Sequence, residues 1–184
     1  MACARWSLQI SYLPTAFRFL IILPQILQKM LQMHRVVIAD TSCFILLIKI
    51  DELSLLSKLY NSVYTTPEIA AEFGHVLPAW INIQEVNDKA RFHALELELD
   101  KGEASAIALS YEIDDSILIL DDMGARKVAR KLNISFTGTF GLMVKAKQTG
   151  IITSVKPILE KVRQTNFRFS EDVFIQTLKE AGEL

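Results

Sequence analysis

The stretch Val36-Val-Ile-Ala-Asp40 is a short apolar run that ends in an aspartate, and Ile117-Leu-Ile-Leu-Asp-Asp122 repeats the pattern with two aspartates. Continuous apolar runs of this length are typical of strands that are buried on both faces, as in a parallel sheet. Segments with helical periodicity alternate with the strands along the chain, which predicts helices on both faces of that sheet. The sequence therefore predicts an α/β fold.

The same patterns place further elements along the chain. Strands are expected at 63–65 and 134–136, and residues 78–86 are expected to be irregular or to contain one more strand. Helices are expected directly after Asp40 and at 53–60, 67–73, 88–99, 103–111, 125–132, 140–148, 155–164 and 170–181. The helix at 67–73 has the clearest bounds, because Pro67 suits a first helical turn and Gly74 suits the position just after a helix.

The overall composition is that of a folded protein. Hydrophobic residues make up 51% of the 184 positions and charged residues 22%, which suits a packed core and argues against disorder. Cys3 and Cys43 are too few to indicate a disulfide framework or a zinc site. We therefore expect a protein of the reducing cytoplasm.

Acidic and basic residues separate along the sequence, although the net charge is only −1. Residues 40–122 contain 16 acids against 5 Lys and Arg, whereas residues 123–170 contain 10 Lys and Arg against one acid. This asymmetry fits two solvated faces. It equally fits an acidic centre that collects metal ions beside a basic surface that holds a phosphate backbone.

Residues 1–34 differ in composition from the rest. They contain no Asp or Glu, and their apolar run at 16–27 is interrupted by Arg18 and Pro24. The run is therefore a poor transmembrane helix, and no small-residue cleavage site marks it as a secretory signal. We interpret 1–34 as an atypical apolar extension, either a surface helix or the result of a start codon placed too early, and 35–184 as the folded domain. No stable membrane insertion is expected.

Acidic side chains follow both buried strands, at the edge where open α/β sheets bind ligands. Asp40 follows the first strand, and Asp121 with Asp122 follows the second. Each could simply cap the next helix, but together they would bring like charges close, which is costly without a cation. Mg²⁺ and Mn²⁺ prefer such hard oxygen ligands. Glu72 and Glu103 could join them, although glutamate in a first helical turn also favours the helix dipole.

Five short strings carry a family resemblance: Ile38-Ala-Asp40-Thr-Ser42, Pro67-Glu-Ile-Ala-Ala-Glu72-Phe73, Leu99-Asp-Lys-Gly-Glu103-Ala104, Leu120-Asp-Asp-Met-Gly-Ala-Arg126 and Thr137-Gly-Thr139. In order and spacing they resemble PIN-domain ribonucleases, in particular the VapC-like toxins of toxin–antitoxin modules, over nearly all of 35–184. The resemblance implies a Rossmann-like three-layer fold with a parallel sheet flanked by helices. It also implies an acidic pocket that binds Mg²⁺ or Mn²⁺ and hydrolyses RNA phosphodiester bonds.

The resemblance also implies residue roles. Catalytic acids are implied at Asp40, Glu72, Glu103, Asp121 and Asp122, and metal ligands at Asp40, Glu103, Asp121 and Asp122. Whether Asp121 or Asp122 is the main ligand stays open. Ser42 and Thr139 resemble hydroxyl residues that support the acidic cluster, and Cys43 is a mild departure from the family pattern.

Partners follow from the same resemblance: an RNA substrate, a small cognate antitoxin protein and a second copy of the chain in a homodimer. Arg126, Lys127 and Arg130 could hold RNA phosphates or simply solvate a helix. The alternative function is a catalytically silent PIN-like module that binds an antitoxin or joins an RNA-processing complex.

Two other protein classes place an aspartate after the first strand. Haloacid-type phosphatases need a second Asp two residues later, where this chain has Ser42. Receiver domains use an acidic pair after the first strand and a single Asp later, whereas this chain has the single acid first. Neither pattern fits.

Overall fold

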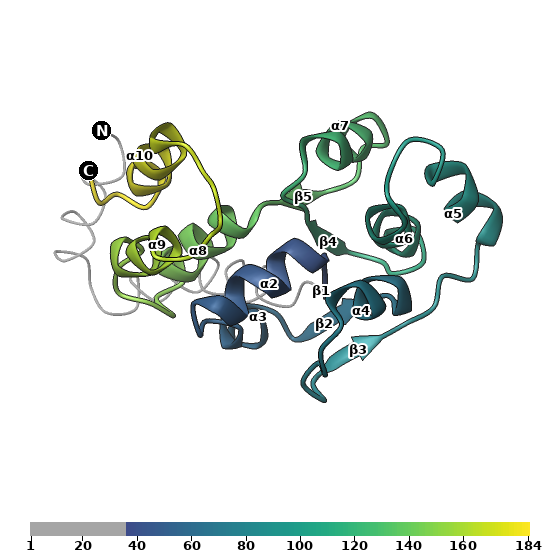
Figure 1. Cartoon of the computed structure of the whole chain (residues 1–184), viewed down its shortest axis with the longest axis horizontal. Helices are drawn as coiled ribbons and strands as arrows, with labels where there is room; N and C mark the ends of the chain where they lie inside the picture. Colours follow the sequence, from purple (N-terminus) through teal and green to yellow (C-terminus); the bar gives the residue numbers. More distant parts are fainter. Residues whose placement is uncertain (1–35) are drawn as a thin grey trace, which may run out of the picture. The chain divides into compact units, whose positions relative to one another are not determined.

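A computed structural model of the chain describes residues 36–184, so the interpretation of residues 1–34 as an extension lies outside the described part. The sheet has five parallel strands in the order β3-β2-β1-β4-β5 (Figure 1). The strands are β1 (Val36–Ala39), β2 (Ser62–Thr65), β3 (Ile81–Ile83), β4 (Ser116–Ile119) and β5 (Phe136–Thr137). The predicted α/β fold with a parallel sheet is confirmed.

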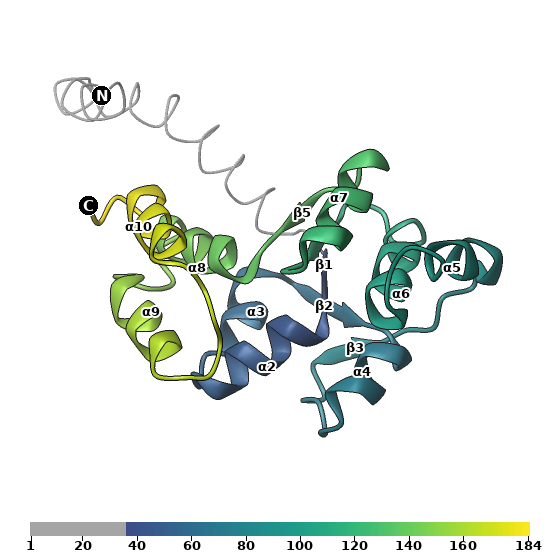
Figure 2. The same cartoon turned by 45° about the horizontal axis from the view of Figure 1, so that its top comes forward.

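Nine helices flank the sheet within residues 36–184. They are α2 (Thr41–Lys49), α3 (Ser54–Leu59), α4 (Pro67–Phe73), α5 (Lys89–Leu95), α6 (Lys101–Ser110), α7 (Met123–Lys131), α8 (Thr139–Gln148), α9 (Lys156–Arg163) and α10 (Glu171–Glu180). Helices α8, α9 and α10 gather at one end of this part of the chain, and α4, α5 and α6 gather at the other (Figures 1 and 2). In this part of the chain, no helix combines the length and hydropathy needed to cross a bilayer.

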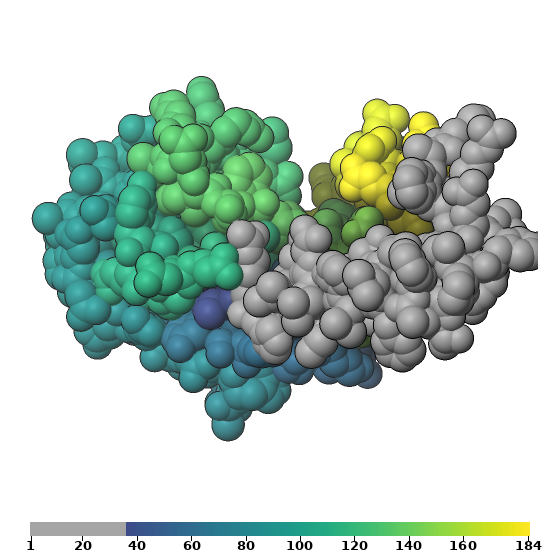
Figure 3. Space-filling model, turned by 180° about the vertical axis from the view of Figure 1, so that it is seen from behind, coloured from purple at the N-terminus to yellow at the C-terminus, as the bar shows by residue number. Residues whose placement is uncertain are grey.

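The core of the sheet is formed by β1 and β4, whose apolar residues face helices on both sides. Val37, Ile38, Leu118 and Ile119 are completely inaccessible to solvent. Only the beginning of β1 is partly exposed, and the strand shows as a small purple patch in the space-filling view (Figure 3). The prediction that the continuous apolar runs are strands covered on both faces is therefore confirmed.

The strand order creates one special position in the sheet. From β1 the chain continues outward to β2 and β3, and it then crosses back to β4 and continues outward in the other direction to β5. The carboxyl ends of β1 and β4, which are paired from Val36↔Ser116 to Ala39↔Ile119, therefore form a topological switch point. Ligands of open α/β sheets bind at such points, and Asp40 and Asp121 follow these two strands.

Several elements differ in extent from the sequence-based expectation, most by one or two residues. Helix α6 begins at Lys101 and not at Glu103, because the Asp100 side chain accepts a hydrogen bond from the Glu103 backbone N–H at 2.8 Å and so caps the helix two residues earlier. Strand β5 contains only Phe136 and Thr137, because its pairing to β4 begins opposite Leu118. Helix α5 is shorter than the expected 88–99, and the uncertain segment 78–86 contains β3.

Helix α6 is the most deeply buried helix of the domain next to the switch point. Its small residues Ala104, Ala106 and Ala108 are fully inaccessible, and the helix packs against α4, α5, β1 and β4. Small side chains allow neighbouring backbones to approach closely. The close packing takes Glu103, in the first turn of α6, out of solvent.

The C-terminal end of the chain is fixed by Glu183. Its carboxylate accepts hydrogen bonds from the backbone N–H groups of Val155 (2.6 Å) and Lys156 (3.1 Å) and from the Ser154 hydroxyl (2.7 Å). It also pairs with Lys147 Nζ at 2.9 Å. Burial works against ionisation, but these hydrogen bonds outweigh it and lower the pKa of Glu183 to about 2. Glu183 therefore ties the C-terminus to the beginning of α9 and to α8.

We predict that Glu183→Gln lowers the free energy of unfolding at pH 7 by about 1–3 kcal/mol, because hydrogen bonds to a charged acceptor are lost. The folded-state pKa lies below the ordinary value of 4.5, so this stabilisation is present above about pH 4.5 and is lost as the pH falls towards 2. Urea unfolding at pH 3 and pH 7 measures the effect. The exposed Glu180, whose side chain bonds only to that of Gln176 among the described residues, supplies the control Glu180→Gln; equal losses in both variants would contradict the prediction.

Candidate active site

Asp40 is a buried carboxyl group at the switch point. It occupies the N-cap position of α2, yet its side chain makes no capping hydrogen bond, and only 5% of the residue is exposed. Burial raises its pKa to about 7, the backbone N–H of Thr41 lowers it in part, and the charges of Asp100, Glu72 and Asp121 raise it further. Simple helix capping therefore does not account for Asp40.

Glu103 is the second buried acid, and it lies in the first turn of α6 with 7% of the residue exposed. Its pKa is also raised to about 7, first by burial and then by the charges of Asp100, Asp122 and Asp40. A hydrogen bond with the backbone of Asp100 lowers the pKa in part. The two buried carboxyl groups thus belong to one electrostatic cluster. The cluster collects acids from the ends of β1 and β4 and from the first turn of α6.

Glu72 approaches this cluster from α4. Its Oε2 atom accepts a hydrogen bond from the Thr41 hydroxyl at 2.8 Å, although Glu72 itself is exposed. A Cβ atom placed on Gly102 would lie only 2.8 Å from the same oxygen and 3.4 Å from Ile69 Cγ1. Glycine at position 102 therefore gives the Glu72 carboxylate its place between α4 and α6.

A chain of buried hydroxyl groups fixes α4 against α6. The Thr66 and Ser105 hydroxyl oxygens are 2.6 Å apart, and Ser105 donates to the Gly102 carbonyl oxygen at 2.7 Å. Since the Ser105 proton is used on Gly102, Thr66 must donate to Ser105, and its own oxygen accepts from the Ile69 backbone N–H at 3.3 Å. These hydrogen bonds fix the first turn of α4, which precedes Glu72, against the first turn of α6, which contains Glu103.

The adjacent acids Asp121 and Asp122 have different surroundings. Asp122 caps its own helix: its Oδ1 atom accepts from the backbone N–H groups of Gly124 (2.6 Å) and Ala125 (2.9 Å) at the beginning of α7. Asp121 accepts from a distant residue, Thr139, whose backbone N–H lies 2.9 Å from Oδ1 and whose hydroxyl lies 2.5 Å from Oδ2. Asp121 therefore caps α8 across the fold, and it also pairs with Arg126 at 3.2 Å.

The other residues expected at the site have varied positions. Thr139 is fully buried and contacts Asp121, whereas the side chain of Ser42, in the first turn of α2, makes no hydrogen bond within residues 36–184. Arg126 turns towards Asp121, Lys127 is exposed, and Arg130 lies 5.6 Å from the centre of the Phe136 ring.

Cys43 lies beside the acids and is 1% exposed. Burial raises the pKa of its thiol far above the usual range, the charge of Asp121 adds to this, and the Thr139 hydroxyl opposes it. The thiol therefore stays neutral and offers no thiolate as a metal ligand or nucleophile.

Two residues of the cluster were not identified from the sequence. Among the neighbouring charges, that of Asp100 acts most strongly on both Asp40 and Glu103. Its position three residues before Glu103 resembles a capping pattern that could have drawn attention to it. Thr41 holds Glu72 across 31 positions of sequence. No local signal could have revealed that contact.

The donor set suits a hard divalent cation by its chemistry. Its members offer carboxylate oxygens only, and two of them are buried with raised pKa values that a cation would lower again. Within residues 36–184, however, no three His, Cys, Asp or Glu side chains converge closely enough to form a coordination shell. The structure thus shows acids gathered at one sheet edge without a formed metal site.

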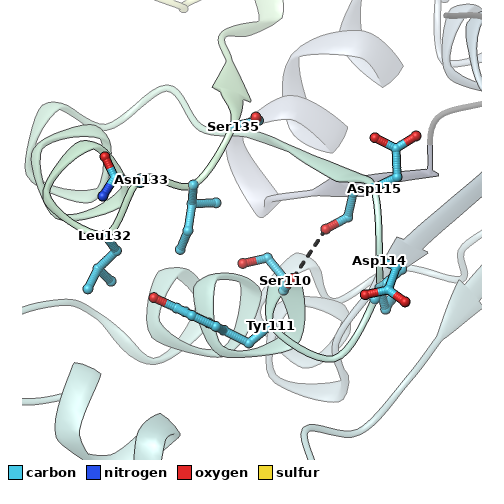
Figure 4. A pocket seen from close by; sticks show the side chains of 10 residues that line it. Ser110, Tyr111, Asp114, Asp115, Leu132, Asn133 and Ser135 are labelled. Carbon is cyan, nitrogen blue, oxygen red and sulfur yellow. Dashed lines mark hydrogen bonds between the residues drawn. The ribbon is translucent and has the colours of Figure 1, made fainter.

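A separate pocket of about 330 Å³ lies at the opposite edge of the sheet. Ser116 and Ser135, which lie at the amino ends of β4 and β5, line it together with Tyr111 and Asn133 (Figure 4). Asp114 and Asp115 add acids there, but these belong to the turn before β4. The pocket is therefore distinct from the acidic cluster, which lies at the carboxyl ends of the same strands.

We predict that the metal-free protein becomes less stable as the pH rises from about 4 to about 7. The pKa of Asp40 is about 7 in the folded state against 3.8 ordinarily, so in this range the folded state holds more protons than the unfolded state. The stabilising contribution of the protonated Asp40 carboxyl group is complete below pH 3.8 and is lost as the pH rises through 7. Asp40→Asn should reduce this slope and exceed the wild type in stability at pH 8 by about 2–4 kcal/mol.

Urea unfolding with a chelator present, at pH 4 and pH 8, measures this difference. The matched control is Asp114→Asn, because Asp114 is exposed and lies at the other edge of the sheet. An unchanged pH slope in Asp40→Asn would contradict the electrostatic account of the cluster.

The comparisons with known proteins agree with this architecture. The family model described as PIN domain matches residues 36–183, which is most of the chain and nearly all of the described part. A search among curated proteins found no match. PIN domains are generally nucleases, and these nucleases generally use divalent metals. The parallel five-stranded sheet flanked by helices is consistent with the three-layer fold of that family, and the chain belongs to the PIN-domain family.

Proposed function

We propose that this PIN-domain protein is a metal-dependent endoribonuclease that hydrolyses RNA phosphodiester bonds. The observation that carries the proposal is the pair of buried carboxyl groups, Asp40 and Glu103, whose pKa values are raised to about 7. Burying several acids together destabilises a protein unless a counter-charge or a bound cation compensates their negative charges. Perturbed titratable groups at a topological switch point are typical of functional sites.

Mg²⁺ or Mn²⁺ is the proposed cofactor. Asp40, Glu103 and the Asp121/Asp122 pair would hold it, because they supply hard oxygen ligands from three segments of one sheet edge. When bound, a divalent ion supplies a water of lowered pKa and neutralises charge on the scissile phosphate. Asp122 accepts its two capping hydrogen bonds on Oδ1, whereas both oxygens of Asp121 accept hydrogen bonds.

The chain's own residues would orient the substrate and keep the acids in place. Thr41 holds Glu72, and Thr139 holds Asp121 through its backbone and its hydroxyl. Lys127 and Arg130 are exposed on α7, which begins directly after the Asp121/Asp122 pair. Cationic side chains at this place would contact the phosphates of RNA and fix its register. The cluster contains no histidine, so proton removal from water would fall to a carboxylate.

The biological role that we propose is that of the toxin in a type II toxin–antitoxin pair, in the cytoplasm. This proposal rests on the resemblance of the five sequence strings to VapC-like toxins. It implies a small cognate antitoxin and a homodimer as partners. Purification of the native protein with its bound partner, followed by mass spectrometry and light scattering, would test both.

One observation favours the alternative function, a catalytically silent PIN-like module that binds an antitoxin or joins an RNA-processing complex. Among the described residues, the acids do not form a coordination shell. Such a module would bind its partner or RNA without cleaving it, with or without Mg²⁺ or Mn²⁺. The presence at one sheet edge of all the acids that the family resemblance implies favours the enzyme.

We predict that the purified protein cleaves single-stranded RNA in the presence of Mn²⁺ or Mg²⁺ and that a chelator stops the reaction. Asp40→Asn should lower the rate by at least about 100-fold, because it removes one anionic oxygen ligand from the buried centre of the cluster. Cleavage of a labelled RNA, followed on a denaturing gel, measures the rates.

The control Asp114→Asn, purified by the same procedure, should cleave at the wild-type rate. Cleavage by Asp40→Asn at that rate would refute the proposed mechanism. If the wild type binds RNA but leaves it intact under all metal conditions, the silent module is the correct description.

A further inference from the structure

Arg126, on α7, pairs with one acid of the cluster, Asp121. From α7 its side chain turns back to the end of β4, where Nε donates to the Leu120 carbonyl oxygen at 2.7 Å and Nη2 donates to Asp121 Oδ1 at 3.2 Å. The side chains of Arg126 and Asp121 are only 27% and 13% exposed. The ion pair is therefore partly buried, and partly buried pairs are weakly screened by solvent and salt.

Gly138 leaves the space that Arg126 occupies. A Cβ atom at position 138 would lie 2.2 Å from Arg126 Nη2 and 3.1 Å from Asp121 Oδ1. The backbone of Gly138, with φ −101° and ψ 171°, is one that any residue can adopt. Glycine is therefore required here for space and not for backbone conformation, and any side chain would displace the guanidinium group from Asp121.

Arg126 is the one cation paired with the cluster in the described part of the chain. Within residues 36–184, no salt bridge joins Asp40, Glu72, Asp100, Glu103 or Asp122 to Lys or Arg. Asp121 also keeps two hydrogen bonds from Thr139, which do not depend on Arg126. Removal of the guanidinium group would thus leave the Asp121 carboxylate oriented but without its neutralising charge.

We propose that Arg126, admitted by Gly138, is a positioning residue that acts as the built-in counter-ion of the cluster and competes with a divalent cation for Asp121. This inference rests on the proposed metal-dependent function. In the metal-free protein the guanidinium group offsets one charge of the crowded acids. When a divalent ion binds, the same positive charge opposes it, so Arg126 weakens metal binding.

The test compares Mn²⁺ binding by calorimetry in the wild type and in two variants that act from different segments. Arg126→Gln removes the charge, and Gly138→Ala leaves all charges in the chain but pushes the guanidinium group away. Both should bind Mn²⁺ at least about tenfold more tightly; tenfold is the effect of removing one like charge from near a divalent ion in a water-like dielectric, and a partly buried site makes the effect larger. Both should also have a lower Tm than the wild type in chelator and a larger Tm increase on addition of Mn²⁺.

The matched control is Lys131→Gln, which removes one positive charge from the same helix at an exposed pair with Glu98 (3.9 Å). Its Mn²⁺ affinity should stay within about twofold of the wild type. Arg126→Lys retains a cation but cannot reproduce both hydrogen bonds, and its affinity should lie between those of the wild type and Arg126→Gln. This variant carries the test if Arg126→Gln does not fold.

The outcomes separate this inference from the proposed function. If the wild type binds Mn²⁺ and the variants bind it equally or more weakly, Arg126 is not a competing counter-ion, while the metal-dependent function stands. If the wild type binds neither Mn²⁺ nor Mg²⁺, the proposed function fails and the counter-ion role fails with it.

Discussion

The mutual repulsion of carboxylates at the carboxyl ends of β1 and β4 is the constraint on which the site depends. The strand order places these two ends side by side, and close packing of α6 then adds Glu103 to the same edge. Burial, and after it the charges of the neighbouring acids, raises the pKa values of Asp40 and Glu103. A fold that only needed helix caps at these positions would gain nothing from burying them, which is why the cluster is the natural centre for chemistry.

The surrounding structure limits that repulsion by giving each acid a separate set of contacts. Asp100 and Asp122 use their oxygens to cap α6 and α7, Glu72 is held by Thr41, and Asp121 is shared between Thr139 and Arg126. Hydrogen bonds from backbone N–H groups and a partly buried cation stabilise the ionised form of a carboxylate. The two buried acids at the centre, Asp40 and Glu103, have no salt bridge within residues 36–184. They are therefore the members of the cluster that an external cation would stabilise most.

Much of this architecture could be predicted from the residues. The apolar runs before Asp40 and Asp121 are strands because continuous apolar residues suit burial on both faces, and α4 begins at Pro67 and is followed by Gly74 in a left-handed conformation, as expected. The expected beginning of α6 is two residues too late because the expectation leaves out the Asp100 cap, and the expected bounds of β5 differ because its two residues are defined only by pairing with β4. The hydroxyl partner of an acid was expected at Ser42, whereas the contact that the structure shows at this turn is made by its neighbour Thr41. Side chains in the first turn of a helix point in directions that residue type alone does not define.

The sequence by itself determined the fold class, the two buried strands and the identity of most acids in the cluster, because local periodicity and the residue after each strand carry that information. Only the tertiary structure decided how the adjacent acids Asp121 and Asp122 differ. Asp122 bonds to backbone groups two and three positions ahead, a local relation that the sequence contains. Asp121 bonds to Thr139 across 18 positions and to an arginine that fits only because Gly138 has no side chain. Contacts between distant segments depend on how the β4 and β5 ends and α7 pack together, and no local pattern encodes that packing.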